Sequence, residues 1–147
     1  MDLLLATSWS WPLLVLRLTL GSIFFAHGAQ KLFGWWGGLG MRGSVLHFAE
    51  DFGIPPAVTV LIALVQGLGG LAVLIGLGAR PAAFALAANA LGAILTAYGR
   101  HGFFMNLTQK PGRRHGIEMH LALLALALAV LVGGGGAFSA DWWLTPK

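Results

Sequence analysis

The first apolar run of this chain, residues 13–26, is long enough to enter a lipid bilayer, and it ends in the polar side chains of His27, Gln30 and Lys31. Two tryptophans and several glycines follow, in the sequence RLTLGSIFFAHGAQKLFGWWGGLG over residues 17–40. At about 100° of rotation per residue, the three polar positions share one face and one depth of a helix. Polar groups inside lipid need a function or a partner, so this face is the first candidate for a site.

The composition indicates a membrane protein. Of 147 residues, 57% are hydrophobic and only 10% are charged, which leaves too little polar surface to cover a soluble globule. The net charge is +4, and the basic residues lie at the ends of apolar segments, so we expect a bilayer and not nucleic acid as the partner. Without cysteine, the chain has no disulfide and no thiolate metal site. Its N-terminus lacks the basic region of a signal peptide, so we expect the first apolar segment to be retained.

Four segments approach the roughly 20 residues that a membrane-spanning helix needs. They cover residues 11–33, 56–77, 82–98 and 117–132, of which the last is short. In the first long loop, Val45, Phe48 and Phe52 lie on the face opposite His47, Glu50 and Asp51, which is typical of a helix on a membrane surface. We therefore predict an all-α fold: a single domain over residues 1–147 with four transmembrane helices in a bundle and a short interfacial helix.

Four spans place both termini on one side of the membrane and the long loops, 34–55 and 99–116, on the other. The loops carry more Lys and Arg than the termini, so the positive-inside tendency predicts cytoplasmic loops and external termini in a bacterial or archaeal inner membrane. Arg17 lies about 9 Å inside the first span and is expected to snorkel to the near interface. The tryptophan pairs 35–36 and 142–143 suit interfacial belts. A tight turn at 78–81 makes the second and third helices antiparallel neighbours.

The polar residues of the four helices are predicted to meet near the long-loop side. Gln66 and Asn89 lie near the middle of their spans, and His27 and Glu118 fall within roughly 5–8 Å of one level. Glu118 and His120 point about 200° apart, so they cannot both face the bundle. A stripe of small residues favours Glu118 as the inward group, with Ala122, Ala125 and Ala129 below it. In the third span, a similar stripe predicts close packing along Ala85, Asn89, Gly92, Thr96 and Gly99.

Each of these residues also has a purely structural interpretation. Lys31 could be a snorkelling anchor, and Glu118 could be a surface residue at the start of its helix. Gln66 and Asn89 could form hydrogen bonds between helices, and His27 could be a packing residue. The convergence of several helices on one side is what favours a functional site.

The residue types limit the chemistry of such a site. A haem b ligated by His27 with His115 or His120 is disfavoured, because one partner lies in a loop and the other faces outward. No spacing within a helix supplies the three or four ligands of a zinc site, so no metal site is predicted. No catalytic residue is assigned. A polar pocket inside the membrane suits a quinone, another lipid headgroup or a proton relay.

The motif over residues 17–40 resembles the opening signature of the DoxX family. The segments LVQGLGGLAVLIGLGAR (64–80), HGFF (101–104) and GIEMHLALLALALAV (116–130) are similar to its later motifs. The family consists of four-helix inner-membrane proteins related to the small, DoxD-like membrane subunit of thiosulfate:quinone oxidoreductase. The resemblance therefore implies a place in a respiratory or redox-protective membrane complex.

Position by position, His27, Gln30, Lys31 and Glu118 match polar positions of that family. Gln66 stands where the second helix of many members has a glutamate. An amide forms hydrogen bonds but does not act as an acid or base at ordinary pH, which argues against catalysis by this subunit alone.

The leading hypothesis is an integral membrane subunit that anchors a redox partner and contributes a quinone-facing pocket. Its candidate residues are His27, Gln30, Lys31, Gln66, Asn89 and Glu118. The alternatives are a small permease or proton-conducting protein lined by Gln66 and Asn89, and a purely structural packing subunit. An enzymatic role is left open, at most as a quinone-site subunit of an oxidoreductase. Besides the bilayer we expect protein subunits or further copies of the chain as partners, and no covalently bound cofactor.

Overall fold

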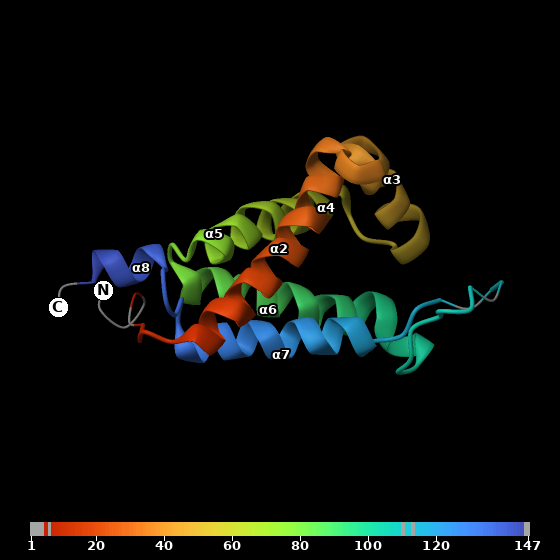
Figure 1. The fold of residues 1–147 in the computed structure, drawn as a ribbon. Coiled ribbons are helices and arrows are strands. Elements are labelled where there is room, and N and C mark those ends of the chain that lie inside the picture. Colours follow the sequence, from red (N-terminus) through yellow and green to blue (C-terminus); the bar gives the residue numbers. More distant parts are fainter. Residues whose placement is uncertain (1–4, 6, 110, 113, 146–147) are drawn as a thin grey trace.

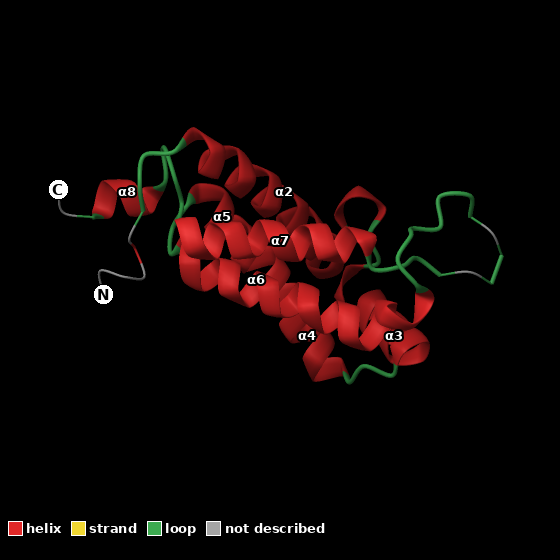
Figure 2. Ribbon diagram, turned by 90° about the horizontal axis from the view of Figure 1, so that it is seen from below, coloured by secondary structure: helices red, strands yellow, loops and turns green. Residues whose placement is uncertain are grey.

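The computed structural model describes residues 5, 7–109, 111–112 and 114–145, and over these residues it contains helices and loops but no strand (Figures 1 and 2). The all-α prediction is confirmed. The α-helices, in chain order, are α2 (Trp11–Phe33), α3 (Gly40–Phe52), α4 (Pro56–Leu64), α5 (Gly70–Ile75), α6 (Ala79–Ala93), α7 (Glu118–Gly133) and α8 (Ala140–Leu144). Other helical segments connect or extend them: the 3-10 turns η1 (Trp35–Gly37) and η4 (Gly99–His101), and the π-helical segments η2 (Val65–Gly69) and η3 (Ile94–Tyr98).

Three helices are long and apolar enough to cross a membrane. They are α2, the continuous helix α4–η2–α5 over Pro56–Ile75, and the continuous helix α6–η3–η4 over Ala79–His101. The first predicted span is confirmed at both ends, and the third is longer at both ends than predicted. The fourth, α7, is apolar but has only 16 residues. At 1.5 Å per residue it is about 24 Å long, somewhat shorter than the hydrocarbon core of a bilayer.

The turn between α5 and α6 lies slightly earlier than predicted. Gly76 and Gly78 both have positive φ, 72° and 57°, a conformation that glycine adopts without the steric cost of a Cβ. Helix α6 therefore begins at Ala79, and Pro81 falls in its first turn, where a missing N–H costs no helical hydrogen bond. The short turn makes the second and third predicted spans antiparallel neighbours, as predicted (Figure 1).

Glycines allow α2 to pack directly against the backbone of α4–η2–α5. A Cβ on Gly21 would lie 2.7 Å from Leu74 N, and one on Gly28 would lie 2.7 Å from Gln66 C. Real Cβ atoms do not approach backbone atoms so closely. Small residues at such contacts let membrane helices approach, because packing and not hydrophobicity drives their association in lipid. Gly28 thus determines how near Gln66 comes to α2.

Helix α7 faces the bundle with a different side from the one predicted. Leu123, Ala127 and Val130 are buried, at most 5% exposed, whereas Ala122 and Ala125 are exposed. The buried positions follow the spacing of His120 and not that of Glu118. The expected inward stripe of small alanines is therefore wrong. Leu123 and Val130 contribute larger side chains to the core, where they pack with apolar residues of the other helices, among them Leu20, Phe24, Val73 and Leu86.

At the end of the bundle near α8, Arg17 is buried and does not snorkel. Only 2% exposed, it donates from Nη1 to Leu74 O at 2.6 Å and from Nη2 to Ala137 O at 3.2 Å. The first of these bonds satisfies a carbonyl at the C-terminal end of α5, where the helix dipole favours a cation. Backbone carbonyls of the folded chain therefore satisfy the guanidinium inside the protein, in place of water or lipid headgroups at the interface.

Asp141, at the start of α8, holds the same end together. Its carboxylate accepts from Gly78 N at 2.7 Å and from Ala79 N at 2.8 Å, and it is 1% exposed. Those two N–H groups begin α6, where a negative charge is favoured. Asp141 also attracts Arg17 electrostatically. The C-terminal segment is therefore attached to the α5–α6 turn by charge and by hydrogen bonds.

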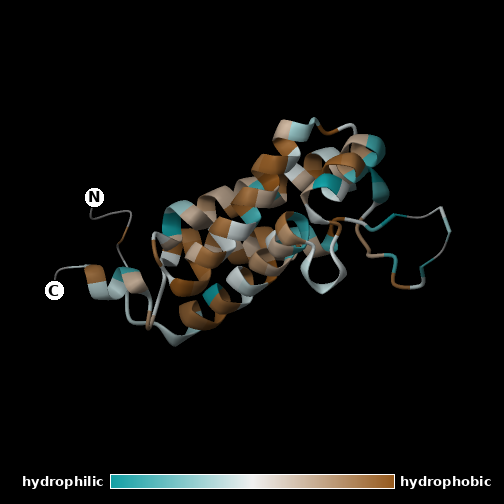
Figure 3. Ribbon diagram, turned by 90° about the horizontal axis from the view of Figure 1, so that it is seen from above, coloured by the Kyte–Doolittle hydropathy of each residue, from teal (hydrophilic) through white to brown (hydrophobic). Residues whose placement is uncertain are grey.

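Helix α3 lies at the opposite end of the bundle, where it packs against α2 and α4. Phe48 and Phe52 are partly buried, whereas His47 and Glu50 are exposed, as the amphipathic pattern predicts. Apolar residues, brown in Figure 3, predominate along the long helices, and many of them are exposed. Leu68, Leu95 and Val132, for example, are 63%, 71% and 75% exposed, which suits contact with lipid.

Candidate functional site

A series of hydrogen-bonded polar side chains crosses three helices in the half of the bundle nearer α3. Lys31 Nζ donates to Gln66 Oε1 at 2.8 Å, and Gln66 Nε2 donates to Asn89 Oδ1 at 2.9 Å. The three residues come from α2, η2 and α6 and are all half-buried. The structure thus brings together three of the six predicted site residues. The same bonds agree with the interpretation of Gln66 and Asn89 as interhelical contacts.

The backbone is irregular where this series meets the second span. Gln66 lies in the π-helical segment η2, and Tyr98 ends the second such segment, η3. A π-helical turn adds one residue to the helix and is frequent at functional sites. Neither segment was predicted, because single-residue insertions leave no trace in an all-apolar pattern.

His27 and Gln30 lie on the α2 face that also carries Lys31, as predicted. The carbonyl of His27 accepts a second hydrogen bond from Lys31 Nζ, at 3.4 Å. The His27 side chain is exposed and Gln30 is half-buried. His27, Lys31 and His120 are close enough to influence one another electrostatically. Together they form a cationic and donor-rich region beside the Lys31–Gln66–Asn89 series.

His120 faces the bundle, contrary to prediction. Its ring stacks on Tyr98 with centroids 4.1 Å apart and planes inclined by 28°. Nδ1 of His120 is buried and has no hydrogen-bond partner among the described residues. Since buried polar atoms are nearly always bonded, an unpartnered ring nitrogen beside a polar series marks a place where a ligand or water would bind. Sequence reasoning assigned His120 outward, because α7 is apolar on every side and its periodicity does not identify the face that packs on the bundle.

Glu118 does not join the site, and its predicted inward orientation is wrong. Its side chain is exposed, and Oε2 accepts from Met105 N at 3.1 Å. The carboxylate therefore organises the loop before α7 and does not partner Lys31. This position at the first turn of a helix is favourable for an acid in its own right.

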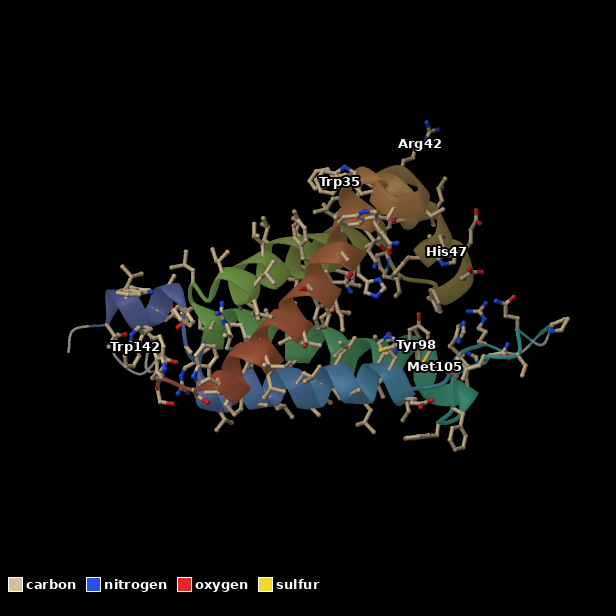
Figure 4. All side chains as sticks on the ribbon, in the orientation of Figure 1. Trp35, Arg42, His47, Tyr98, Met105 and Trp142 are labelled. Carbon is tan, nitrogen blue, oxygen red and sulfur yellow. The ribbon has the colours of Figure 1, made fainter. Side chains whose placement is uncertain are left out.

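Aromatic side chains of α3 close the site toward the long loops. Phe48 places its ring centroid 5.8 Å from Lys31 Nζ, and Phe52 lies 6.1 Å from the Tyr98 ring. Figure 4 shows Tyr98 among the side chains between α3 and the α6–α7 pair, with Arg42 pointing away from them. Over the described residues, no three His, Cys, Asp or Glu side chains are grouped as a metal would need.

An apolar layer lies between this region and the end near α8. Leu20, Val73 and Leu86 are fully buried there, and Phe24 is 3% exposed. They belong to one hydrophobic cluster with side chains of α7. The polar series therefore ends at Asn89 and does not continue toward Arg17 among the described residues.

Comparison with known proteins identifies the family to which the chain belongs. The model of the family described as DoxX matches residues 12–99, which is more than half of the chain and includes the whole Lys31–Gln66–Asn89 series. The chain belongs to the DoxX family. This confirms the resemblance found in the sequence.

A relative in Bacillus subtilis (strain 168) carries the name "Putative oxidoreductase CatD". The two chains are 35% identical over 83 residues, which is 56% of this chain and 57% of the relative. The similarity therefore spans little more than half the length of that relative. No solved structure matches the chain significantly.

Proposed function

We propose that this DoxX protein is a membrane subunit of a redox complex, in which it binds a quinone headgroup beside Lys31 and anchors an electron-transferring partner. The observation that carries the proposal is the hydrogen-bonded series Lys31–Gln66–Asn89, which places a cationic donor and two amides among apolar helices. Polar groups at such a depth are costly in lipid and are usually functional. The oxidoreductase name of the Bacillus subtilis relative supports a redox role.

The side chains around Lys31 match the chemistry of a quinone. A quinone is a flat ring with two carbonyl oxygens, so it needs donors at its edge and apolar surface against its faces. Lys31 has three N–H groups, of which Gln66 and the His27 carbonyl take two. Phe48 and the Tyr98–His120 stack supply the aromatic surface.

Reduction of a quinone to a quinol takes up two electrons and two protons. His27 and His120 are the side chains near Lys31 that suit proton delivery, since imidazole titrates near neutral pH. Gln66 binds and orients but transfers no proton. In this proposal the electrons come from the partner subunit, and this chain supplies the binding site and the protons.

The partner would dock at the end that carries α3 and the loop between η4 and α7 (Figure 1). Arg42, Arg100 and Arg114 lie at this end, and the positive-inside tendency supports a cytoplasmic location in the inner membrane. Exposed Trp35 and Trp36 beside α3 suit the headgroup level, with α3 on the membrane surface and α7 as a fourth span. Cysteines introduced at Ser8 and Thr108 test this topology: only the first should react with an impermeant reagent added to intact cells.

The test of quinone binding is Lys31→Met, which keeps the length of the side chain and removes its donors. Wild-type protein purified in mild detergent should retain quinone, and Lys31→Met and His27→Ala should each bind a short-chain quinone about tenfold more weakly or worse. Arg42→Gln is the matched control, since it removes an exposed charge that points away from the site. The proposal is wrong if wild-type protein binds no quinone or if Lys31→Met binds it as well as Arg42→Gln does.

The same polar series also favours a second candidate, a proton-conducting protein. Lys31, Gln66 and Asn89 would line the entrance of its path. The apolar layer of Leu20, Val73 and Leu86 opposes it, because a conducting path has to be polar or wet throughout. Proton flux into liposomes separates the two candidates: a quinone-binding anchor should give no flux above that of empty vesicles.

A further inference from the structure

A cleft at the long-loop end of the bundle lies outside the proposed quinone site. Its volume is about 240 Å³, and it lies between the end of α3, the end of the third span and the loop before α7. Among the ionisable side chains that line it, the basic ones outnumber the acidic one; the lining residues include Asp51, Phe52, Thr96, Arg100, His101 and Arg114.

One of the two arginines is held in place by the fold. Arg114 donates from Nη1 to Asp51 O at 3.2 Å, its Nη2 lies 3.6 Å from Asp51 Oδ1, and its Cζ lies 5.2 Å from the Phe52 ring centroid. Asp51 is shared, because its other carboxylate oxygen lies 2.8 Å from His47 Nδ1. The Asp51 carboxylate therefore helps to position Arg114, and its charge is shared between Arg114 and His47.

The other basic groups of the cleft are unused. Arg100 and His101 have no hydrogen bond or ion pair with another described residue. An arginine presents a planar fork of donors that matches the oxygens of a phosphate. Two arginines against one shared carboxylate leave the cleft with an excess of positive charge.

We propose that this cleft binds the phosphate headgroup of an anionic phospholipid, with Arg100 and Arg114 as its principal ligands. This inference depends only on the membrane location of the protein and does not require quinone binding. Basic pockets at the ends of transmembrane helices are suited to anionic lipid headgroups.

The surface beside the cleft favours a lipid over free phosphate. Gly92, Thr96 and Arg100 follow one another at four-residue spacing along the third span, and Thr96 Oγ1 donates to Gly92 O at 2.7 Å. A Cβ placed on Gly92 would meet no atom within 4 Å, so the predicted close packing of the third span does not include Gly92, and the surface there is open. The neighbouring row carries exposed Leu91 and Leu95, at 45% and 71%. A ligand with an anionic head and hydrocarbon chains fits both parts of this surface.

The test compares two lipids with identical chains, dioleoyl phosphatidylglycerol and dioleoyl phosphatidylcholine, on delipidated protein in non-ionic detergent. Native mass spectrometry should give at least about tenfold preference for the anionic lipid in wild-type protein. Arg100→Gln and Arg114→Gln should each remove most of it. Arg42→Gln, which changes an arginine outside the cleft, should leave the preference unchanged, and thermal melts should confirm that every variant is folded.

Several results would overturn the inference. Equal binding of the two lipids by wild-type protein would remove its basis, and so would an equal loss in Arg42→Gln, which would indicate unspecific attraction. Displacement of the anionic lipid by millimolar inorganic phosphate would identify a free-phosphate site. An acidic peptide that binds in an Arg100-dependent way, with no lipid preference, would identify a protein-docking surface.

Discussion

The two ends of the bundle both bury polar side chains, but they satisfy them in different ways. Near α8, Arg17 and Asp141 are 2% and 1% exposed and form hydrogen bonds with backbone groups. Near α3, Lys31 and Gln66 are half-buried and bond to other side chains. Buried polar groups therefore bond to the backbone at one end and mainly to other side chains at the other, and we propose that only the second end binds a ligand.

The difference follows from the nature of the partners. Backbone groups at helix ends are fixed by the helices, so a side chain that bonds to them fastens one element to another. Side-chain partners can rotate about their own bonds, so the position of a side chain that bonds to them is less strictly fixed by the helices. Among the described residues, each end also has one buried nitrogen without a hydrogen-bond partner, Arg17 Nε near α8 and His120 Nδ1 near α3. The predictions below test this contrast, beginning with the largest effect.

We expect the largest loss of stability from Asp141→Ala. It removes two charge-assisted bonds, from Gly78 N and Ala79 N, and leaves Arg17 without its acid. At about 1.5–3 kcal/mol for each such bond, the free energy of unfolding should fall by about 3 kcal/mol or more. Denaturation in detergent micelles, followed by circular dichroism, measures this loss. Exposed Asp51→Ala should change it by less than about 1 kcal/mol.

Asp141→Ala should lower the stability of the protein without changing its affinity for quinone. At a temperature where the Asp141→Ala protein is still folded, its affinity for quinone should equal that of wild type, because the apolar layer separates the two ends. A parallel loss of affinity would show that the ends are coupled and that the contrast is wrong.

Gly28→Ala should destabilise the protein, whereas Gly92→Ala should not. The added Cβ at position 28 would lie 2.7 Å from Gln66 C, but at position 92 it would meet no atom within 4 Å. Overpacking of this kind costs about 1–3 kcal/mol. It should also move Gln66 away from Lys31 and weaken quinone binding. Thermal melts and binding measured on both variants test the pair, and equal behaviour would contradict the packing.

Gln66→Leu should affect binding more than stability. The substitution keeps the approximate volume and removes the bonds to Lys31 and Asn89. Hydrogen bonds between membrane helices contribute about 0.6 kcal/mol each, so a loss of roughly 1 kcal/mol in unfolding is expected. Quinone affinity should fall about tenfold, since Lys31 is no longer held in place. A large loss of stability with unchanged affinity would instead assign Gln66 a purely structural role.

The smallest effect is expected at Glu118. Its carboxylate is exposed and bonds only Met105 N among the described residues, so Glu118→Gln should leave quinone affinity within about twofold of wild type. His120→Phe preserves the stacked ring but removes its nitrogens, and it should lower the affinity clearly. The opposite ranking of these two variants would restore the inward position of Glu118 that the sequence suggested.

Much of the site could be predicted from the chain alone. The bounds of α2, the shared face of His27, Gln30 and Lys31, and the depth of Gln66 and Asn89 all follow from helical rise and rotation. Hydrophobic runs and polar interruptions are local properties, so no partner helix is needed to recognise them.

Tertiary structure decided three features: the orientation of α7, the burial of Arg17 and Asp141, and the cleft that contains Arg100 and Arg114. Helix α7 consists mainly of alanine and leucine on every side, and lipid accepts both, so its periodicity does not identify an inner face. Arg17 and Asp141 find backbone groups that only the folded chain brings to them. The sequence thus determines which segments form apolar helices and where polar residues interrupt them, whereas packing determines which of their side chains meet.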